Sequence, residues 1–414
     1  MLNVDGRDDE EFKDTEIGRI PKKWEIVKLG DITTLKNGER PLMINDNNVV
    51  PVYGANGVMG YTSKFLVDND FTLVIGRVGA SGEVHIGNGK IWISDNAIYS
   101  ESYDKSKVYL PLLFYLLKFK NLSKFATKST HPIITQSFLN SINLPLPPLP
   151  EQKAIAKVLS TVDEAIQKCN ELIAKTERLK QGLMRELLTK GIGHKEFKDT
   201  EIGRIPKEWE VVNVRDVADV KGGKRLPKGH NLLDCPTSHP YLRVVDFMNM
   251  GVNINNLKYL SPKTYEHIKR YTISCEDVYI SIAGTIGLVG VIPPELDGAN
   301  LTENAAKLCN LKNIDKLFLA YVLNSIAKPQ INALIGKATQ PKLALFRIEK
   351  IKFPLPPLPE QQKIAEILST IDKKLELERK RKEKLERIKK GLMNDLLTGK
   401  RRIPKEMWEK IGGE

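Results

Sequence analysis

The sequence has no long hydrophobic run and few cysteines. None of its apolar stretches reaches the roughly 18 residues that a membrane-spanning helix needs, and the first residues, MLNVDGRDDEEF, are acidic and polar. We therefore expect no transmembrane helix, no secretory signal and a cytoplasmic protein. The 4 cysteines stand far apart and form no CxxC pair, which indicates isolated thiols in a reducing compartment.

Recognisable catalytic motifs are also missing. The sequence has no NPPY-type methyltransferase motif, P-loop, HExxH or GxSxG, and no nuclease-type carboxylate cluster followed by ExK. Its 6 histidines are scattered without the spacing of metal ligands. Two glycine series lack the GK[ST] of a phosphate-binding loop, so we interpret them as tight turns: Gly54, Gly57, Gly60 and Gly284, Gly287, Gly290. We expect a non-catalytic binding protein without a cofactor or metal of its own.

What the sequence does contain is an internal duplication. The stretch EFKDTEIGRIPKKWEIV starts at Glu11 and returns as EFKDTEIGRIPKEWEVV at Glu196, 185 positions later. The stretch PLPPLPEQ starts at Pro145 and returns at Pro354, 209 positions later. Each copy runs in the same order: an IPKxWE motif, a divergent globular stretch, a proline-rich run and a long charged segment. This order indicates tandem duplication of a whole unit.

A partial third copy follows the second. The stretch GKRRIPKEMWEK, starting at Gly399, imitates IGRIPKEWE. We expect residues 399–414 to pack as a partial repeat, in the place that an upstream IPKxWE element would occupy. A chance likeness among basic residues is the alternative.

The proline-rich runs are predicted to be stiff hinges that lead into long helices. Proline fixes φ and keeps the preceding residue extended, which favours a polyproline-like arm. The EQ pair that follows each run falls in the first helical turn, where acidic groups suit the helix dipole. Apolar residues then recur every three or four positions for about 38 residues, roughly 57 Å as a helix, in a coiled-coil-like stripe.

One narrow apolar stripe does not stabilise a helix by itself, so we expect the two long helices to pack on each other. Tandem units tend to pair about a pseudo-twofold axis, which makes the helices antiparallel. The run at residues 373–390 is rich in lysine and arginine. It is either a solvated helix face or a surface for DNA phosphates or an acidic partner.

The divergent stretches are typical of strands followed by a helix. We predict an α+β fold: two globular, mainly β domains separated by two long antiparallel helices, with an internal pseudo-twofold repeat. Trp24 and Trp209, one after each IPK motif, are predicted to anchor a domain to a helix. The predicted parts are residues 11–143 (first domain), 144–195 (hinge and central helix), 196–352 (second domain), 353–398 (hinge and second helix) and 399–414 (C-terminal segment).

Lysine and arginine outnumber aspartate and glutamate by 64 to 51, a formal charge of +13. A positive field of this size favours a polyanionic partner. The charge does not by itself distinguish a nucleic acid from an acidic protein.

The repeated motifs resemble one known family. TEIGRIPKxWE occurs twice, PLPPLPEQ precedes a long helix twice, and GLM followed by LLT occurs twice, with variable domains between them. This combination is similar to the specificity subunit of type I restriction–modification systems, over nearly the whole chain from Glu11 to Trp408. PVYGANGVMGYTS, from Pro51 to Ser63, also looks like one variety of target-recognition domain in that family.

The resemblance implies a function and a set of partners. Each variable domain would be a target-recognition domain that reads one half of a bipartite double-stranded DNA site. The helices would set the spacer between the halves and dock two methyltransferase subunits, which bring S-adenosylmethionine. Two restriction subunits, ATP- and Mg²⁺-dependent motor-nucleases, would complete the enzyme.

Candidate DNA-binding residues are polar or basic side chains on the expected loops. Phosphates are bound mostly by lysine and arginine, whereas base choice depends on a few side chains. We expect residues shared between matching loops to contact the DNA backbone, and differing neighbours such as His131 and Gln340 to read bases. The candidates are Lys36, Asn37, Arg40, Asn56, Arg77, Ser81, Lys128, Thr130 and His131 in the first domain, and Lys224, Arg225, Lys228, His230, Arg243, Thr285, Lys337, Thr339 and Gln340 in the second.

Two rival interpretations stay open. A coiled-coil scaffold with duplicated protein-binding heads would use the positive charge for an acidic protein partner. A stand-alone nuclease would show metal-dependent cleavage. The aromatic residues Tyr53, Tyr61 and Trp92 are expected in core or turn packing rather than stacked on bases.

Overall fold

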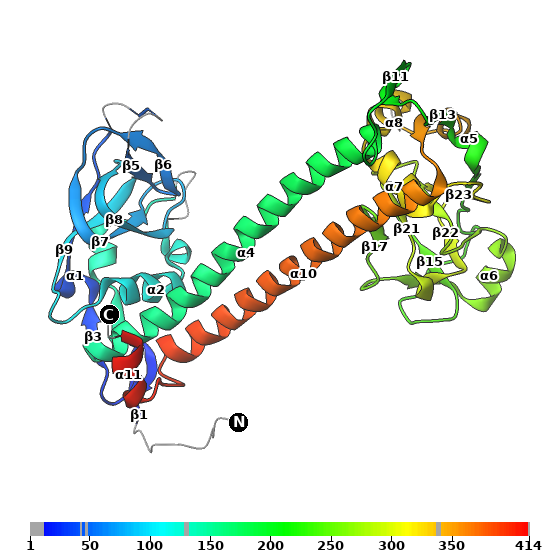
Figure 1. Ribbon diagram of the computed structural model, residues 1–414. Helices are drawn as coiled ribbons and strands as arrows, with labels where there is room; N and C mark the ends of the chain where they lie inside the picture. Colours follow the sequence, from blue (N-terminus) through cyan, green and yellow to red (C-terminus); the bar gives the residue numbers. More distant parts are fainter. Residues whose placement is uncertain (1–11, 42–43, 46–48, 128–131, 337–340, 413–414) are drawn as a thin grey trace. The chain divides into compact units, whose positions relative to one another are not determined.

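The computed structural model describes residues 12–41, 44–45, 49–127, 132–336 and 341–412 (Figure 1). The chain divides into two compact units, unit 1 with residues 1–171 and 380–414, and unit 2 with residues 172–379. Two long helices, α4 (Leu149–Lys190) and α10 (Leu358–Leu397), each contribute one part to each unit. Unit 1 is thus assembled from two separate stretches of chain and unit 2 from one.

Unit 1 is built on a six-stranded sheet of order β4-β9-β7-β8-β5-β6. All neighbours are antiparallel except β5 and β8. Successive residues of β7 face opposite sides, so Leu73 and Ile75 pack in the main core with α2 while Val74 packs in a smaller core on the other face. The elements are β4 (Thr33–Asn37), β5 (Val50–Gly54), β6 (Gly57–Thr62), β7 (Val67–Gly76), β8 (Val84–Ile93), β9 (Ala97–Tyr103) and α2 (Leu110–Lys120).

Shorter elements surround this sheet. A hairpin of β1 and β2 carries the first repeat motif, and β3 and α1 lead from it into β4. Between α2 and α4 lie η1, α3 and β10, and α11 follows α10. Their bounds are β1 (Phe12–Thr15), β2 (Gly18–Pro21), β3 (Glu25–Lys28), α1 (Leu29–Ile32), η1 (Leu122–Phe125), α3 (Gln136–Asn140), β10 (Asn143–Leu146) and α11 (Lys405–Gly412).

Unit 2 has the same strand plan, but its two long strands are interrupted. Where unit 1 has the ten-residue strands β7 and β8, unit 2 has β19 then β20, and β21 then β22. The result is two four-stranded sheets, β14-β23-β20-β21 and β18-β15-β22-β19, with β15 and β22 as the parallel pair. The strands are β14 (Asp219–Gly222), β15 (Pro240–Leu242), β18 (Lys258–Tyr259), β19 (Thr272–Ile273), β20 (Val278–Ser281), β21 (Val289–Val291), β22 (Ala299–Leu301) and β23 (Ala305–Cys309).

The remaining elements of unit 2 include a second hairpin with the repeat motif, made of β11 and β12. They are β11 (Phe197–Thr200), β12 (Gly203–Pro206), β13 (Glu210–Asn213), α5 (Val214–Val217), η2 (Val244–Asp246), β16 (Phe247–Met248), β17 (Gly251–Val252), α6 (Pro262–Ile268), η3 (Pro294–Leu296), α7 (Lys316–Asn324), α8 (Lys328–Leu334), α9 (Leu345–Ile348) and β24 (Lys352–Leu355). With the two long helices, these elements confirm the predicted α+β fold with an internal repeat.

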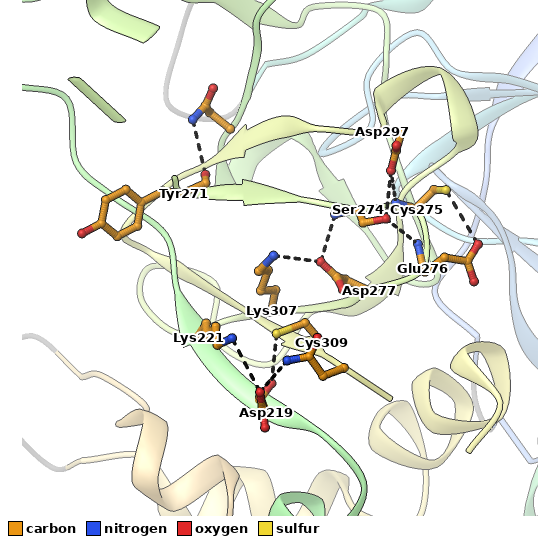
Figure 2. Close-up of polar contacts among 12 residues, drawn as sticks. Asp219, Lys221, Tyr271, Ser274, Cys275, Glu276, Asp277, Asp297, Lys307 and Cys309 are labelled. Carbon is orange, nitrogen blue, oxygen red and sulfur yellow. Dashed lines mark hydrogen bonds and ion pairs between the residues drawn. The ribbon is translucent and has the colours of Figure 1, made fainter. Parts of the chain in front are cut away.

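A hydrogen-bonded turn makes the break between β19 and β20 (Figure 2). Asp297 accepts from the Ser274 hydroxyl at 2.9 Å and from the Cys275 N–H at 2.7 Å, and Asp277 accepts from the Ser274 N–H at 2.9 Å. Asp277 also binds the Lys307 ammonium of β23 at 3.0 Å, with side chains only 8% and 20% exposed. An unpaired charge in such a poorly solvated place would carry a large desolvation cost. The ion pair therefore holds the turn against β23.

The proline-rich runs were predicted to be stiff, polyproline-like arms, but the start of each run is a paired β-strand instead. β10 pairs antiparallel with β3, and β24 pairs antiparallel with β13. Each pair is a two-stranded sheet, so Pro145 and Pro354 have no second neighbouring strand that would require their missing N–H. Each pair fastens the start of a long helix to the repeat motif.

The helices α4 and α10 run antiparallel in each unit. In unit 1, Asp163 of α4 lies 2.5 Å from Lys389 of α10. In unit 2, Lys180 of α4 lies 2.5 Å from Asp372 of α10. The two aspartates are equivalent repeat positions, as are the two lysines, so each pair is the other with the helices exchanged. Each unit therefore contains the same helix–helix ion pair, as an internal duplication predicts, and the predicted antiparallel pairing is confirmed within each unit.

A buried glutamine at the start of each long helix holds the loop before the domain helix. Gln152 and Gln361 are 1% and 0% exposed. Each amide oxygen accepts from one backbone N–H, and each amide nitrogen donates to two carbonyls. The partners are Tyr109, Lys107 and Pro147 in unit 1, and Asp315, Asn313 and Pro356 in unit 2.

The two tryptophans are buried, as predicted. Trp24 and Trp209 are 1% and 0% exposed. Their indole N–H groups donate to Glu151 of α4 at 3.1 Å and to Glu360 of α10 at 3.0 Å. The expected role as anchors to the long helices is confirmed, and the glutamates hold the tryptophans as well as suiting the helix dipole.

The segment after α10 packs on unit 1, but not in the predicted place. The Arg402 guanidinium donates two hydrogen bonds to Glu151, both at 2.7 Å. At the equivalent point of unit 2, Glu360 accepts from the Ile192 N–H at 2.8 Å and lies 2.9 Å from the His194 ring. The segment therefore replaces the residues between α4 and β11. It does not replace an IPKxWE element, because β2 already holds that position.

Candidate nucleic-acid interface

Three segments of unit 1 meet where β4 and β7 end and β9 begins. The Arg77 and Val78 N–H groups donate to the Asn96 carbonyl at 2.8 and 3.3 Å. The Gly38 N–H donates to the Ala97 carbonyl at 2.9 Å. We call residues 38–40, 76–82 and 94–97 the loop frame of unit 1.

Unit 2 has a loop frame with the same hydrogen bonds, made of residues 223–225, 281–287 and 302–305. The Ile282 and Ala283 N–H groups donate to the Asn304 carbonyl at 2.8 and 3.2 Å, and the Gly223 N–H donates to the Ala305 carbonyl at 3.0 Å. The backbone is therefore held alike in both frames, while side chains differ: Arg77 of unit 1 corresponds to Ile282 of unit 2.

Glycines make the tight turn of each frame. Gly79 and Gly82 have φ of 85° and 86°, and Gly284 and Gly287 have φ of 72° and 78°. These left-handed values favour glycine, which has no Cβ to clash. For Gly284 and Gly287 the predicted turn is confirmed.

Charged and polar candidates of unit 1 lie on or beside its frame. Asn37, Arg40 and Asn56 are exposed. Arg77 is half-buried, with Nη1 3.5 Å from the Asp95 carbonyl. Lys36 is exposed and forms an ion pair with a β9 carboxylate, Glu101, which raises the pKa of Lys36.

Ser81 is different from the other candidates of unit 1. It is 5% exposed, and its hydroxyl lies within hydrogen-bond distance of two carbonyl oxygens, that of Arg77 at 2.9 Å and that of Pro132. Those bonds close the frame from inside. We therefore leave Ser81 out of the proposed DNA contacts.

The basic candidates of unit 2 form a run along its frame. Lys224, Arg225 and Lys228 are exposed, as is Thr285 in the neighbouring loop. The Arg225 Nε lies 2.7 Å from Glu303 Oε1, with 79% of the arginine side chain exposed. A pair this open is weak and can exchange partners at little cost.

Two further candidates of unit 2 are already used within the fold. Arg243 donates two hydrogen bonds to the buried Asp246, at 3.0 and 2.7 Å. His230 Nδ1 lies 2.8 Å from the Thr264 hydroxyl, and its ring packs edge-on against His267. Both side chains therefore already have hydrogen-bond partners within unit 2.

Comparison with known proteins identifies the family. A family model described as "Type I restriction modification DNA specificity domain" matches residues 21–178 and again residues 206–387. The chain is 34% identical over 427 residues to a putative type I restriction enzyme MjaX specificity subunit of Methanocaldococcus jannaschii, covering 95% of this chain and 97% of that one. It is 32% identical to the MjaVIII specificity subunit of the same organism, with the same coverage. This chain belongs to the specificity subunits of type I restriction–modification systems.

Solved structures share the fold of this specificity subunit. The S subunit of a type I system from M. genitalium has a TM-score of 0.67 at 20% identity, covering 90% of this chain and 96% of that one. A chain from a study of type I complex assembly has a TM-score of 0.51 at 17% identity, covering 92% and 99%.

Six candidates of the specificity subunit lie outside the described residues: Lys128, Thr130, His131, Lys337, Thr339 and Gln340. The flanking residues are described. Ile133 bridges to Val78 of the unit 1 frame, and Lys342 bridges to Ala283 of the unit 2 frame. The contrast between His131 and Gln340 stays a prediction.

Aromatic residues of the first target-recognition domain partly fit their expected roles. Trp92 is 8% exposed, and the half-buried Tyr53 hydroxyl lies 3.4 Å from the Ile86 carbonyl. Tyr61 is 40% exposed on the edge strand β6, so it is not a core residue. Glu39 lies on the unit 1 frame but is absent from the sequence prediction, which favoured basic and neutral polar side chains.

The described part of this specificity subunit contains no group of three His, Cys, Asp or Glu side chains that could hold a metal ion. Nor does any helix in that part combine the length and hydropathy needed to cross a membrane.

Proposed function

We propose that this specificity subunit reads a bipartite DNA site, with each unit recognising one half, and that it catalyses no step itself. The loop frames carry the proposal. Their backbones are hydrogen-bonded alike, yet their exposed side chains differ, as expected of one scaffold adapted to two sequences. Base edges are read by a few side chains, and phosphates by lysine and arginine.

The long helices would set the spacer between the half-sites and dock two methyltransferase subunits. The helix α4 has 42 residues and is therefore roughly 63 Å long. One turn of B-DNA spans about 34 Å, so this length corresponds to a separation of one to two turns between half-sites. Part of the basic run at 373–390 is used in helix pairing, since Arg379 and Lys389 bind Glu177 and Asp163 of α4. For those two side chains, pairing is favoured over contact with DNA.

The chemistry would belong to the partner subunits. S-adenosylmethionine would be bound by the methyltransferase subunits, and ATP and Mg²⁺ by two restriction subunits. The names of the relatives, all type I restriction enzyme specificity subunits, support this division of roles.

Methylome sequencing tests the proposal. The chain is expressed with its cognate methyltransferase subunit in cells that lack other DNA methylation. We expect one bipartite motif with a fixed spacer, and we expect Arg77→Ala to change one half of it only. A contiguous motif, or no motif at all, would contradict the proposal.

Salt-dependent binding tests the scaffold alternative. A protein that neutralises phosphates loses affinity for random duplex DNA steeply as salt rises. If the chain with its methyltransferase partner shows no such affinity and no retention on heparin, the scaffold is favoured.

A further inference from the structure

A glycine followed by two exposed charged residues comes directly after β4 in unit 1 and directly after β14 in unit 2. The sequences are Gly38-Glu39-Arg40 and Gly223-Lys224-Arg225. A Cβ on Gly38 would lie 2.2 Å from the Ser94 carbonyl oxygen, and a Cβ on Gly223 would lie 2.2 Å from the Leu301 carbonyl oxygen. The chain therefore passes against the neighbouring strand at a distance that only glycine permits.

The residue after each glycine is held on both sides of its backbone. In unit 1 the Glu39 N–H donates to the Ile93 carbonyl at 2.9 Å, and the Glu39 carbonyl accepts from Trp92 Nε1 at 2.8 Å. The side chain itself is exposed.

In unit 2 a different aromatic residue donates the hydrogen bond to the carbonyl after the glycine. The Lys224 N–H donates to the Leu301 carbonyl at 2.8 Å, and the Lys224 carbonyl accepts from the Tyr241 hydroxyl at 2.9 Å. Trp92 is on β8 and Tyr241 on β15, so the two donors are not equivalent residues. One backbone position is thus fixed by two unrelated donors, which is unexpected for ordinary surface.

The exposed side chains at this position have opposite charge. Glu39 offers only acceptors, whereas the Lys224 ammonium offers only donors. Lys224 Nζ lies 5.4 Å from the Tyr271 ring centroid, a contact that leaves its N–H groups available. The next residue is arginine in both units.

We propose that residues 39 and 224 determine base choice, and that the arginines beside them, Arg40 and Arg225, contact phosphate. Glu39 accepts a hydrogen bond from a base amino group in the major groove, and Lys224 donates to guanine O6 or N7. Rigid display from a fixed backbone gives each residue one reachable base pair. This inference rests on the proposed function.

Charge reversal on the full chain, in complex with its methyltransferase subunit, tests the inference. The variants are Glu39→Lys and Lys224→Glu, with Glu25→Lys and Lys263→Glu as exposed, charge-matched controls. Methylation of a randomised duplex library is sequenced. We expect each variant to change base preference about tenfold or more at one position of one half-site, and the controls to leave the motif unchanged.

Three outcomes decide the matter. An unchanged motif in both half-sites, with affinity lowered evenly, overturns the inference and leaves the proposed function intact. A wild-type complex without any bipartite motif overturns the proposed function instead. If a charge-reversed variant fails to fold, Glu39→Gln decides: glutamine pairs with adenine, so an unshifted preference at that position overturns the inference.

Discussion

The two units have equivalent glutamates at the start of a long helix, Glu151 and Glu360, but the partners of the two carboxylates differ. Glu151 is 0% exposed and holds the Arg402 guanidinium, itself 12% exposed. Glu360 is 15% exposed. Its carboxylate accepts a hydrogen bond from the Ile192 N–H and lies 2.9 Å from the ring of His194, a side chain that can be neutral. A fully buried carboxylate needs a partner that is always charged, whereas a partly solvated one is satisfied by hydrogen-bond donors. Two segments of unrelated sequence can therefore satisfy the same glutamate position of the repeat. Each supplies the kind of partner that the solvent exposure of its own glutamate requires.

The largest expected effect comes from removing the guanidinium. Arg402→Ala leaves Glu151 buried without its cation, which costs about 3 kcal/mol of unfolding free energy. Arg401→Ala is the control, because its side chain is 79% exposed and lies 3.6 Å from Asp395. Hydrogen exchange measured by mass spectrometry separates the units: protection should fall in unit 1 alone. Equal loss in both variants would show that the ion pair does not stabilise unit 1.

Replacing Gln152 and Gln361 tests whether their equivalent hydrogen bonds contribute equally to the stability of the two units. Gln152→Leu and Gln361→Leu each leave one N–H and two carbonyls unpaired in a buried site, at a cost of about 2 kcal/mol each. We expect the losses to match within about 0.5 kcal/mol, each in its own unit, by denaturant unfolding with exchange readout. A clearly unequal cost would mean that the matching hydrogen bonds do not have matching energetic roles.

A smaller effect is expected when the two equivalent ion pairs between α4 and α10, Asp163–Lys389 and Lys180–Asp372, are broken. Lys389→Met and Lys180→Met each remove an ammonium that is 22% exposed, and solvent screening limits the cost to about 1 kcal/mol. Tyr115 and Tyr321 still donate to the aspartates at 2.8 Å, and burial raises the pKa of both tyrosines.

The double variant of these lysines sharpens the comparison. Because the pairs share no partner, the two costs should add within about 0.5 kcal/mol. Strong non-additivity in thermal unfolding would show that the helix pairs act as one element.

The smallest effect is a pH dependence that His85 gives to unit 1. Burial lowers the pKa of His85, whose ring lies 3.3 Å from the Ala55 carbonyl. Below about pH 6.5 the unfolded chain binds the proton more readily than the folded one. The contribution of neutral His85 to the free energy of unfolding is therefore fully present above that pH and is lost as the pH falls. Because the ring is half-exposed, we expect a loss of about a few tenths of a kcal/mol.

His85→Gln should abolish this decline between pH 7 and pH 5 in exchange experiments. Unit 2 has no histidine at the equivalent position, where the strand register places Gly290. A decline of the same size in the variant would assign the pH dependence to other groups.

Much of the fold follows from local patterns, and the parts that do not follow depend on tertiary partners. The long helices and the buried Trp24 are readable because periodicity and repetition are local. The proline run predicts a stiff polyproline-like arm, whereas its first residues form a strand through pairing with β3, which is distant in sequence. Gln152 and Ser81 look like ordinary polar residues, and their burial depends on segments distant in sequence.

The candidate site was predictable to the same degree. The likeness of IGRVGASG to ISIAGTIG indicates matching loops, and the loop frames confirm this. Which residues face outward was not predictable, since Arg243 and His230 are drawn into internal hydrogen bonds. The sequence does not predict Glu39 as a site residue, because phosphates repel an acidic side chain and only a base amino group would accept one as a partner.

The split composition of unit 1 has a consequence for biosynthesis. Unit 2 occupies one continuous stretch, so it can complete its core as soon as the ribosome has released residue 379. Unit 1 must wait for residues 380–412, including Arg402, although its sheet was translated first. Domains generally fold as units during translation, so a ribosome stalled when residue 379 has emerged, but residues 380–412 have not, should carry a folded unit 2 and an incomplete unit 1.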